Sequence, residues 1–204
     1  MTRAAARGLQ ATRAGVWLLD ERRELLRLVD RYDARDDQHI TTDPPLAPHP
    51  EYLKVMRAQR IVAVADSQTD RRTREFSEGY FGPADVRSNL DVTLRLRGEL
   101  MGVLSVEQIG RRREWAAEDE VFAGVLGDVV SLALESAERF RAEAALRKSE
   151  RRLSDIFKFT NDSIVLYRVA LDGSVFCEDI NPAGEATTGV LRDEAIGLRP
   201  QDVL

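Results

Sequence analysis

The sequence predicts an α+β protein in which two small sheet-containing modules are joined by one long helix. Three observations lead to this fold class. Two strand-like runs, 90–96 and 100–107, meet across a short turn at Gly98, as in an antiparallel hairpin. Residues 118–157 form a long helical stretch, and a second pair of strands, 163–170 and 174–180, follows it.

The first module is expected to be an antiparallel sheet with helices on one face and loops over the other. Residues 3–12 are expected to be the end of a helix whose start is clipped. The remaining elements are expected in this order: a strand hairpin at 16–20 and 25–32, a proline-rich loop at 33–50, a helix at 51–58, a strand at 61–65 and an irregular cover at 66–86 with a short helix at 73–80.

The long helix at 118–157 is expected to act as a connecting rod. About 40 residues span about 60 Å at ~1.5 Å per residue, which is too long for a helix of one small domain. Its apolar residues recur at steps of four and three, the coiled-coil period, which predicts a parallel homodimer. The positions of this seam are Leu126, Val130, Ala133, Ala137, Phe140 and Ala144. The alternative is a solitary amphipathic helix that lies on its own domain.

A later set of apolar residues on this helix, Leu146, Leu153 and Ile156, is out of phase with the first. Such a slip indicates a coiled-coil stutter or a change of packing partner. We take it as the candidate two-state element of the rod.

The second module begins near Ser149. Asp172 and Gly173 form a tight turn between its two strands, and Pro182 lies at the start of a short helix. Two strands and short helices cannot close a sheet or bury a large core, so this module is expected to be incomplete.

Composition limits the classes of partner. The net charge is −5 and the pI is near 5.3, which argues against nucleic acid and membrane surfaces, since both attract clustered positive charge. The sequence has no apolar run of about 18 residues, so no transmembrane helix is expected. A single cysteine, Cys177, excludes an internal disulfide and fits a reducing cytoplasm.

Two resemblances follow from these patterns. Residues 13–135 resemble a GAF domain, through the stretches 16–20, 61–66, 87–92, 98–104 and 115–122. Residues 149–204 resemble the first half of a PAS domain, through 149–157, 164–167, 172–173, 181–183 and 194–197. We therefore expect a GAF-like domain at 1–135, a signalling helix at 118–157 and a partial PAS domain at 149–204.

The order of GAF domain, helix and PAS domain resembles the input end of bacterial signalling proteins. It implies a non-catalytic, cytoplasmic sensory region, chiefly of a sensor histidine kinase and alternatively of a cyclic-di-GMP cyclase. A different alternative is a structural dimerisation module whose GAF pocket is filled and binds no ligand.

The same resemblances imply which cofactors to expect. Glu107 and Gln108 stand where cyclic-nucleotide-binding GAF domains have Asn and Lys, which disfavours a cyclic nucleotide. Bilin-carrying GAF domains attach the chromophore to a cysteine, and Cys177 lies outside this module, which predicts no covalent bilin through a GAF cysteine. The helix after Asn181 and Pro182 lacks the cysteine of flavin-adduct PAS domains, which disfavours a flavin adduct.

A ligand pocket is expected beneath the irregular cover. Phe76, Tyr80 and Phe81 lie in the cover, and Asp91 on the neighbouring strand supplies a polar contact. Aromatic walls with a few polar groups are typical of small-ligand pockets. The alternative is that these aromatic side chains fill the hollow themselves.

No catalytic or metal site is expected. His39, His49 and Asp43 lie in one polar loop, but their spacing matches no metal site. The sequence contains no nucleophile elbow of the form Gly-x-Ser-x-Gly and no glycine-rich phosphate loop.

Overall fold

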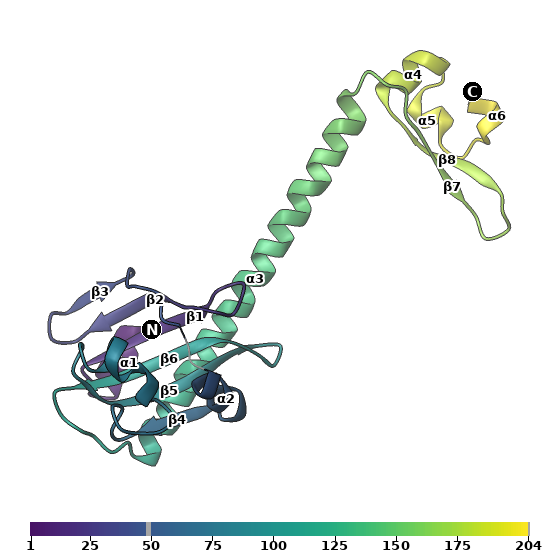
Figure 1. The fold of residues 1–204 in the computed structure, drawn as a ribbon. Coiled ribbons are helices and arrows are strands. Elements are labelled where there is room, and N and C mark those ends of the chain that lie inside the picture. The colour runs from purple at the N-terminus through teal and green to yellow at the C-terminus, as the bar shows by residue number, and fades with distance from the viewer. Residues whose placement is uncertain (48–49, 204) are drawn as a thin grey trace. The chain divides into compact units, whose positions relative to one another are not determined.

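The computed structural model describes residues 1–47 and 50–203, which form two compact units, Met1–Ala137 and Glu138–Leu204 (Figure 1). The predicted α+β fold class is confirmed, with an antiparallel sheet, a long helix and a smaller second sheet. Among the described residues, no helix is both long enough and apolar enough to cross a bilayer.

The first unit is built on a six-stranded sheet in the order β3-β2-β1-β6-β5-β4, and each neighbouring pair is antiparallel. The strands are β1 (Arg13–Leu19), β2 (Leu26–Asp33), β3 (Gln38–Ile40), β4 (Ile61–Val64), β5 (Val86–Leu96) and β6 (Glu99–Ile109). The short β3 was missed within the predicted loop 33–50. β3 pairs with β2 through backbone hydrogen bonds, with Tyr32 opposite His39. A strand of three residues is too short to show the alternation of apolar and polar side chains by which strands are recognised in sequence.

The β5–β6 hairpin contains the two longest strands of this sheet and is longer than predicted. It turns at Arg97 and Gly98, whose φ angles of 51° and 86° suit a two-residue hairpin turn. Gly102 lies where β6 approaches β1, and a Cβ atom there would be 2.1 Å from the Trp17 carbonyl oxygen. This close approach explains a glycine inside a buried strand.

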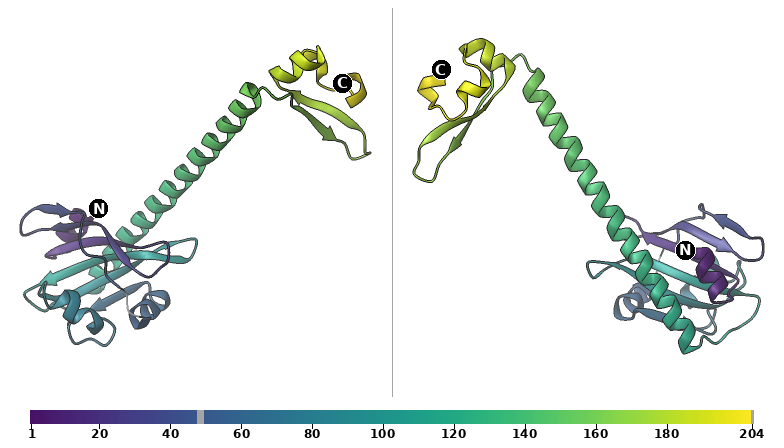
Figure 2. Two further views of the ribbon diagram at one scale, coloured as in Figure 1. Left: turned by 45° about the horizontal axis from the view of Figure 1, so that its top comes forward. Right: turned by 180° about the vertical axis from the view of Figure 1, so that it is seen from behind.

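One face of the sheet is covered by α1 (Thr2–Gly8) and by the first part of α3 (Ala117–Phe159), which passes in front of the strands in the right view of Figure 2. The side chains at this contact are small. Ala123 and Gly127 of α3 are buried, and a Cβ atom on Gly127 would be 2.4 Å from Val92 Cγ1. The backbone of α3 therefore lies unusually close to β5.

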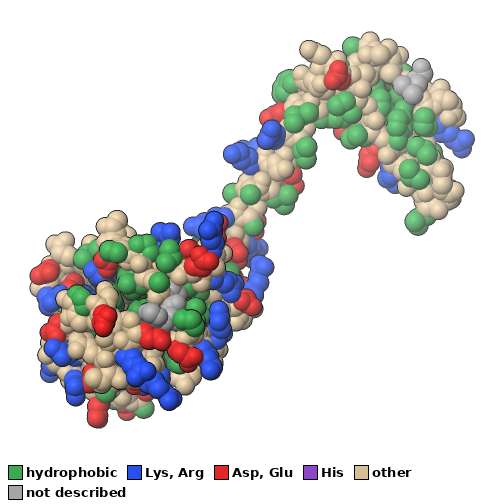
Figure 3. Space-filling view, in the orientation of Figure 1, with side chains coloured by type: hydrophobic (Ala, Val, Ile, Leu, Met, Phe, Trp, Pro, Cys, Tyr) green, Lys and Arg blue, Asp and Glu red, His purple; other side chains and the backbone are tan. Residues whose placement is uncertain are grey.

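The other face is covered by α2 (Pro50–Ala58) and by two short turns, η1 (Arg74–Phe76) and η2 (Ser77–Phe81). This face has a second apolar core, in which Tyr52, Met56 and Phe76 pack over Trp17 and Val103. On the exterior of the first unit, Figure 3 shows Lys and Arg interspersed with Asp and Glu, so that face carries no extended field of one sign.

The second unit has a two-stranded antiparallel sheet of β7 (Val165–Val169) and β8 (Val175–Ile180), with three short helices, α4 (Pro182–Thr188), α5 (Arg192–Ala195) and α6 (Pro200–Val203). Its small core is formed by Cys177, Ile180, Ala195 and Val203. Buried Asn181 caps α4 through the Gly184 N–H at 2.8 Å and accepts the Ile164 N–H at 2.8 Å. One side chain thus joins the start of α4 to the start of β7.

Candidate functional site

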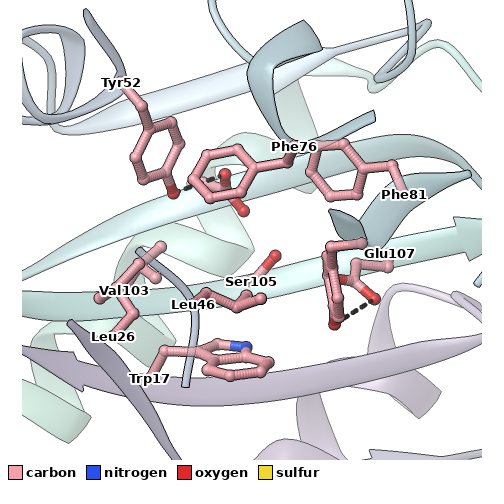
Figure 4. Close-up of a pocket in the computed structure, with 11 residues that line it drawn as sticks. Trp17, Leu26, Leu46, Tyr52, Phe76, Phe81, Val103, Ser105 and Glu107 are labelled. Carbon is pink, nitrogen blue, oxygen red and sulfur yellow. Dashed lines mark hydrogen bonds between the residues drawn. The ribbon is translucent and has the colours of Figure 1, made fainter. Parts of the chain in front are cut away.

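A small cavity lies between the cover and the sheet of the first unit (Figure 4). Its volume is about 30 Å³. The side chains that line it come from both layers: Trp17, Leu26, Leu46, Tyr52, Phe76, Tyr80, Phe81, Asp91, Val103, Ser105 and Glu107. The structure therefore brings together all four side chains of the predicted pocket, Phe76, Tyr80, Phe81 and Asp91.

Aromatic side chains fill most of this hollow. The ring centroids of Tyr52 and Phe76 are 4.9 Å apart and those of Phe76 and Phe81 are 5.8 Å apart, both in edge-to-face contact. Trp17 meets Tyr80 edge to face at 5.7 Å. A ligand of drug size needs roughly 300 Å³ or more, so the closed cavity admits only a much smaller group.

The cover over the cavity has an uncommon backbone. Ser77–Phe81 forms a single π-helical turn, a rare feature that is frequently found at functional sites. The turn closes through a hydrogen bond from the Gly82 N–H to the Ser77 carbonyl at 2.7 Å. A Cβ atom on Gly82 would be 2.6 Å from that carbonyl oxygen, so the turn that carries Tyr80 and Phe81 requires this glycine.

Asp91 projects from β5 toward the cover and is 2% exposed. Its Oδ2 accepts hydrogen bonds from the Tyr52 hydroxyl at 2.9 Å and from the Asn89 amide at 2.7 Å. Its Oδ1 accepts no hydrogen bond of normal geometry from the described residues. Burial raises the pKa of Asp91 to about 6, and the polar side chains of Ser105, Asn89 and Tyr52 partly oppose this rise.

The partners of Asp91 are themselves constrained. Asn89 is held by a hydrogen bond from the Ser67 hydroxyl to its Oδ1 at 2.8 Å. Burial raises the pKa of Tyr52 well above its ordinary value, and the negative charge of Asp91 raises it further. Tyr52 is therefore a neutral donor at physiological pH, and the orientation of the Asp91 carboxyl group is fixed from two sides.

A second buried polar group borders the cavity. Arg13 and Glu107 form an ion pair at exposures of 5% and 2%, and the Tyr80 hydroxyl donates to Glu107 Oε1 at 3.1 Å. The Arg13 guanidinium lies 5.4 Å from the centre of the Tyr80 ring. Burial, the largest single effect, lowers the pKa of Arg13, but the charge and hydrogen bond of Glu107 together with Tyr80 and Asp33 outweigh burial and raise this pKa above its ordinary value.

The sequence analysis did not place Arg13, Tyr52 or Glu107 in the pocket. Arg13 precedes a strand as an isolated charge, which is the usual pattern of a surface residue. Glu107 is opposite Arg13 in the strand pairing, 94 residues away, and no local pattern reveals such a pair. For Tyr52, the apolar face of α2 was a sequence pattern that could have indicated burial against the sheet.

The predicted seam on α3 is divided between two environments. Val130 is buried in the core of the first unit, and Leu126 and Leu134 pack against that core. By contrast, Ala133 and Ala144 are exposed, Ala137 is half-buried and Phe140 is 71% exposed. Leu126 and Val130 therefore cover their own sheet, and the dimer seam itself stays a prediction.

The loop histidine does not gather metal ligands. His39 Nδ1 lies 2.9 Å from Asp30, whereas Asp43 pairs with Arg31. His49 lies outside the described residues. Across residues 1–47 and 50–203, no group of three or more His, Cys, Asp or Glu side chains could hold a metal ion.

Solved structures with a similar fold are GAF domains. The blue-light absorbing form of the PixJ GAF domain from Thermosynechococcus elongatus is 21% identical, with a TM-score of 0.59, over 71% of this chain and 86% of that one. JSC1_58120g3 in its far-red absorbing dark state, with bound biliverdin IXα, is 15% identical, with a TM-score of 0.56, over 67% and 86%. The GAF domain of an Acinetobacter phosphoenolpyruvate-protein phosphotransferase is 18% identical, with a TM-score of 0.50, over 70% and 82%.

These similar folds correct the cofactor prediction. The sequence analysis predicted no covalent bilin and disfavoured a flavin adduct and a cyclic nucleotide. The matching structures include light-absorbing ones, and one of them holds biliverdin, so the exclusion of covalent bilin from the expected cofactors was wrong. At these identities the likeness shows the fold alone, and no specific cofactor is assigned. Cys177, the one cysteine, is buried in the second unit.

The family comparison agrees with the fold. The comparison with curated proteins gave no match. The GAF domain family matches residues 1–134, which include the sheet, its cover, the cavity and the start of α3. This chain belongs to the GAF domain family.

Proposed function

We propose that this chain is the sensory input region of a signal-transduction protein, in which the GAF domain passes its state along α3 to the second unit. GAF domains are regulatory sensory modules, which supports an input role. The observation that carries the proposal is the continuity of α3. One unbroken helix, Ala117–Phe159, supplies residues to both compact units.

β5 gives this relay a physical basis. Neighbouring side chains of a strand point to opposite faces of the sheet. Asp91 lines the cavity on one face, and the next residue, Val92, contacts the backbone of α3 at Gly127 on the other. A ligand that shifts β5 at Asp91 therefore acts on the closest contact of the helix, provided that α3 has two arrangements of different energy.

We place the dimer contact on the side of α3 that faces away from its own sheet. Val121, Val125, Val129 and Leu132 are exposed there. Val125 lies about 200° round the helix from both Ala123 and Gly127, at ~100° per residue. The steps of four, four and three between the exposed residues suit a helix pair, and burying them in a homodimer removes apolar surface from water.

The finer assignments belong to the same proposal. In this proposal the second unit is a partial PAS domain, and its strand pair and Asn181-capped helix support the assignment. The whole protein is a bacterial sensor histidine kinase, or alternatively a cyclic-di-GMP cyclase, and acts in the cytoplasm. The small volume of the closed cavity supports a second candidate, a structural dimerisation module that senses no ligand.

Hydrogen exchange separates the relay from the structural module. Phe81→Ala opens the cavity, and the relay predicts faster exchange of α3 amides between residues 117 and 137. The matched control is Met56→Ala, which truncates a buried side chain of the same core that does not line the cavity. Unchanged α3 exchange in Phe81→Ala, or an equal change in both variants, would favour the structural module.

The mass of the purified chain tests the dimer. We expect twice the chain mass of 22.9 kDa by light scattering, and the monomer mass for Val125→Glu combined with Leu132→Glu. Glu138→Lys changes charge at an exposed position on another side of the helix and should leave the dimer intact. A monomeric parent chain would refute this contact.

A further inference from the structure

The carboxylate of Asp91 is the unbalanced charge of the cavity. Glu107, the other carboxylate that lines the cavity, is paired with Arg13. Among the described residues, no Lys, Arg or His forms an ion pair with Asp91. No hydrogen bond of normal geometry from the described residues reaches its Oδ1, although the Ser105 hydroxyl lies close enough to lower the pKa of the carboxyl group. A buried carboxylate oxygen that lacks a full set of hydrogen bonds is energetically unfavourable. A ligand that donated a hydrogen bond to it would therefore bind with a favourable free energy.

Oxygen atoms gather at this end of the cavity. Asp91 Oδ1, the Ser105 hydroxyl and the Tyr52 hydroxyl all belong to residues that line it, and Ser105 is opposite Asp91 in the β5–β6 pairing. Tyr52 already uses its proton in the bond to Asp91, so its oxygen is left as an acceptor. An ammonium group carries three donors and no acceptor, which is the complement of this set.

The walls of the cavity favour positive charge as well. The rings of Trp17, Tyr52 and Phe76 line it, and the face of an aromatic ring attracts a cation. The same aromatic cluster already holds one cation, since Arg13 lies over the Tyr80 ring. An anion would meet two carboxylates here, and a neutral apolar group would leave Asp91 Oδ1 without a partner.

The volume sets the size of the ligand. A water needs about 10–15 Å³ of such space, so a cavity of about 30 Å³ has room for roughly two water-sized groups. Methylammonium has two heavy atoms, one cationic and one apolar. It fits without movement of the cover, whereas a longer alkyl chain requires Phe76 and Phe81 to move.

We propose that this cavity binds an alkylammonium ion of about the size of methylammonium, with the ammonium group on Asp91, Ser105 and Tyr52 and the methyl group against the aromatic rings. The inference rests on the proposed sensory function and names the chemical class of its signal. Binding would place a cation beside β5 on the side opposite the Gly127–Val92 contact.

The test is a titration of the full chain with methylammonium chloride at constant ionic strength, followed by NMR. The chain has two tryptophans, and Trp17 lines the cavity while Trp115 packs on the other face of the sheet. We expect the Trp17 indole N–H signal to shift with a dissociation constant in the millimolar range, the best that two heavy atoms allow, while the Trp115 signal stays in place.

An uncharged control ligand and variants of the chain make the test specific. Methanol has the size of methylammonium without its charge and should bind at least about tenfold more weakly. Asp91→Asn keeps the shape of the side chain and should weaken methylammonium binding by about tenfold or more. Asp128→Asn removes a carboxylate on the surface of α3 and should bind as the parent chain does. If Asp91→Asn does not fold, Tyr52→Phe, which removes one acceptor oxygen, should still weaken binding.

Three results would overturn the inference: no shift of the Trp17 signal at tens of millimolar methylammonium, equal binding of methanol, or unchanged binding by Asp91→Asn. Any of them would mean that the cavity holds water or an uncharged group. The dimer mass and the hydrogen exchange of Phe81→Ala do not depend on a ligand, so they would still support the relay if the alkylammonium proposal alone failed.

Discussion

The two faces of the GAF sheet are packed in opposite ways. On the α3 face, small residues such as Ala123 and Gly127 bring a helix backbone against β5. On the cover face, large aromatic rings surround a cavity and two buried polar groups centred on Asp91 and Glu107. The first arrangement transmits displacement because it is tight, and the second can respond to a ligand because its polar groups are incompletely satisfied.

The largest expected effect on stability is on the cover face, at the buried ion pair. Arg13→Met leaves Glu107 buried and unpaired, so we expect a loss of about 3–5 kcal/mol in the free energy of unfolding. Urea denaturation measures it. Arg23→Met removes an exposed partner of Glu99 and should cost less than about 1 kcal/mol. Equal losses in the two variants would show that the Arg13–Glu107 pair is not buried as described.

The next effect is on the α3 face. Gly127→Ala places a methyl group 2.4 Å from Val92 Cγ1, and relief of this overlap should cost about 1–3 kcal/mol in the same denaturation experiment. Gly79→Ala is the contrast on the cover face. No atom lies within 4 Å of the added methyl group, so this change should be neutral or stabilising by up to about 1 kcal/mol. A harmless Gly127→Ala would mean that α3 is not tightly packed on β5.

A smaller effect of opposite sign is expected at Asp91. Its pKa in the folded protein is about 6, above its ordinary value of 3.8, so the folded state binds the extra proton between these values. The burial of the charged form destabilises the protein above pH 6, and this penalty is relieved as the pH falls from 6 toward 4. Asp91→Asn should therefore stabilise the chain by about 2 kcal/mol at pH 7.5 and by little at pH 4.

Denaturation of parent and variant across this pH range measures the difference between them. Tyr52, Asn89, Ser105 and Glu107 are the polar groups around Asp91, and the comparison leaves all four in place. A variant that is less stable than the parent at pH 7.5 would show that Asp91 is satisfied as a carboxylate. That result would also weaken the case for a cationic ligand.

Much of the fold could be predicted from the sequence, because the strand pairs and α3 have strong periodic patterns of apolar residues. The pocket residues Phe76, Tyr80 and Phe81 were found because they cluster within six residues in an otherwise irregular segment. The Arg13–Glu107 pair could not be found, since it joins strands far apart in the chain. The phase of a dimer seam on α3 stays a prediction, because both faces of the helix are apolar, with Val125 on one and Val130 on the other. The small residues Ala123, Gly124 and Gly127 were the overlooked sign of the buried face.

The central claim is that β5 couples the cavity to α3, and a double-mutant cycle tests it directly. Asp91→Asn changes a side chain of β5 on the cavity face. Gly127→Ala changes the α3 contact of the next residue of β5, Val92, on the opposite face, so the two substitutions share no direct contact. If β5 couples them, their effects on the free energy of unfolding should differ from the sum by about 0.5 kcal/mol or more, whereas Asp91→Asn with Gly79→Ala should be additive. Additivity of the Asp91→Asn and Gly127→Ala effects within about 0.3 kcal/mol would contradict the relay through β5.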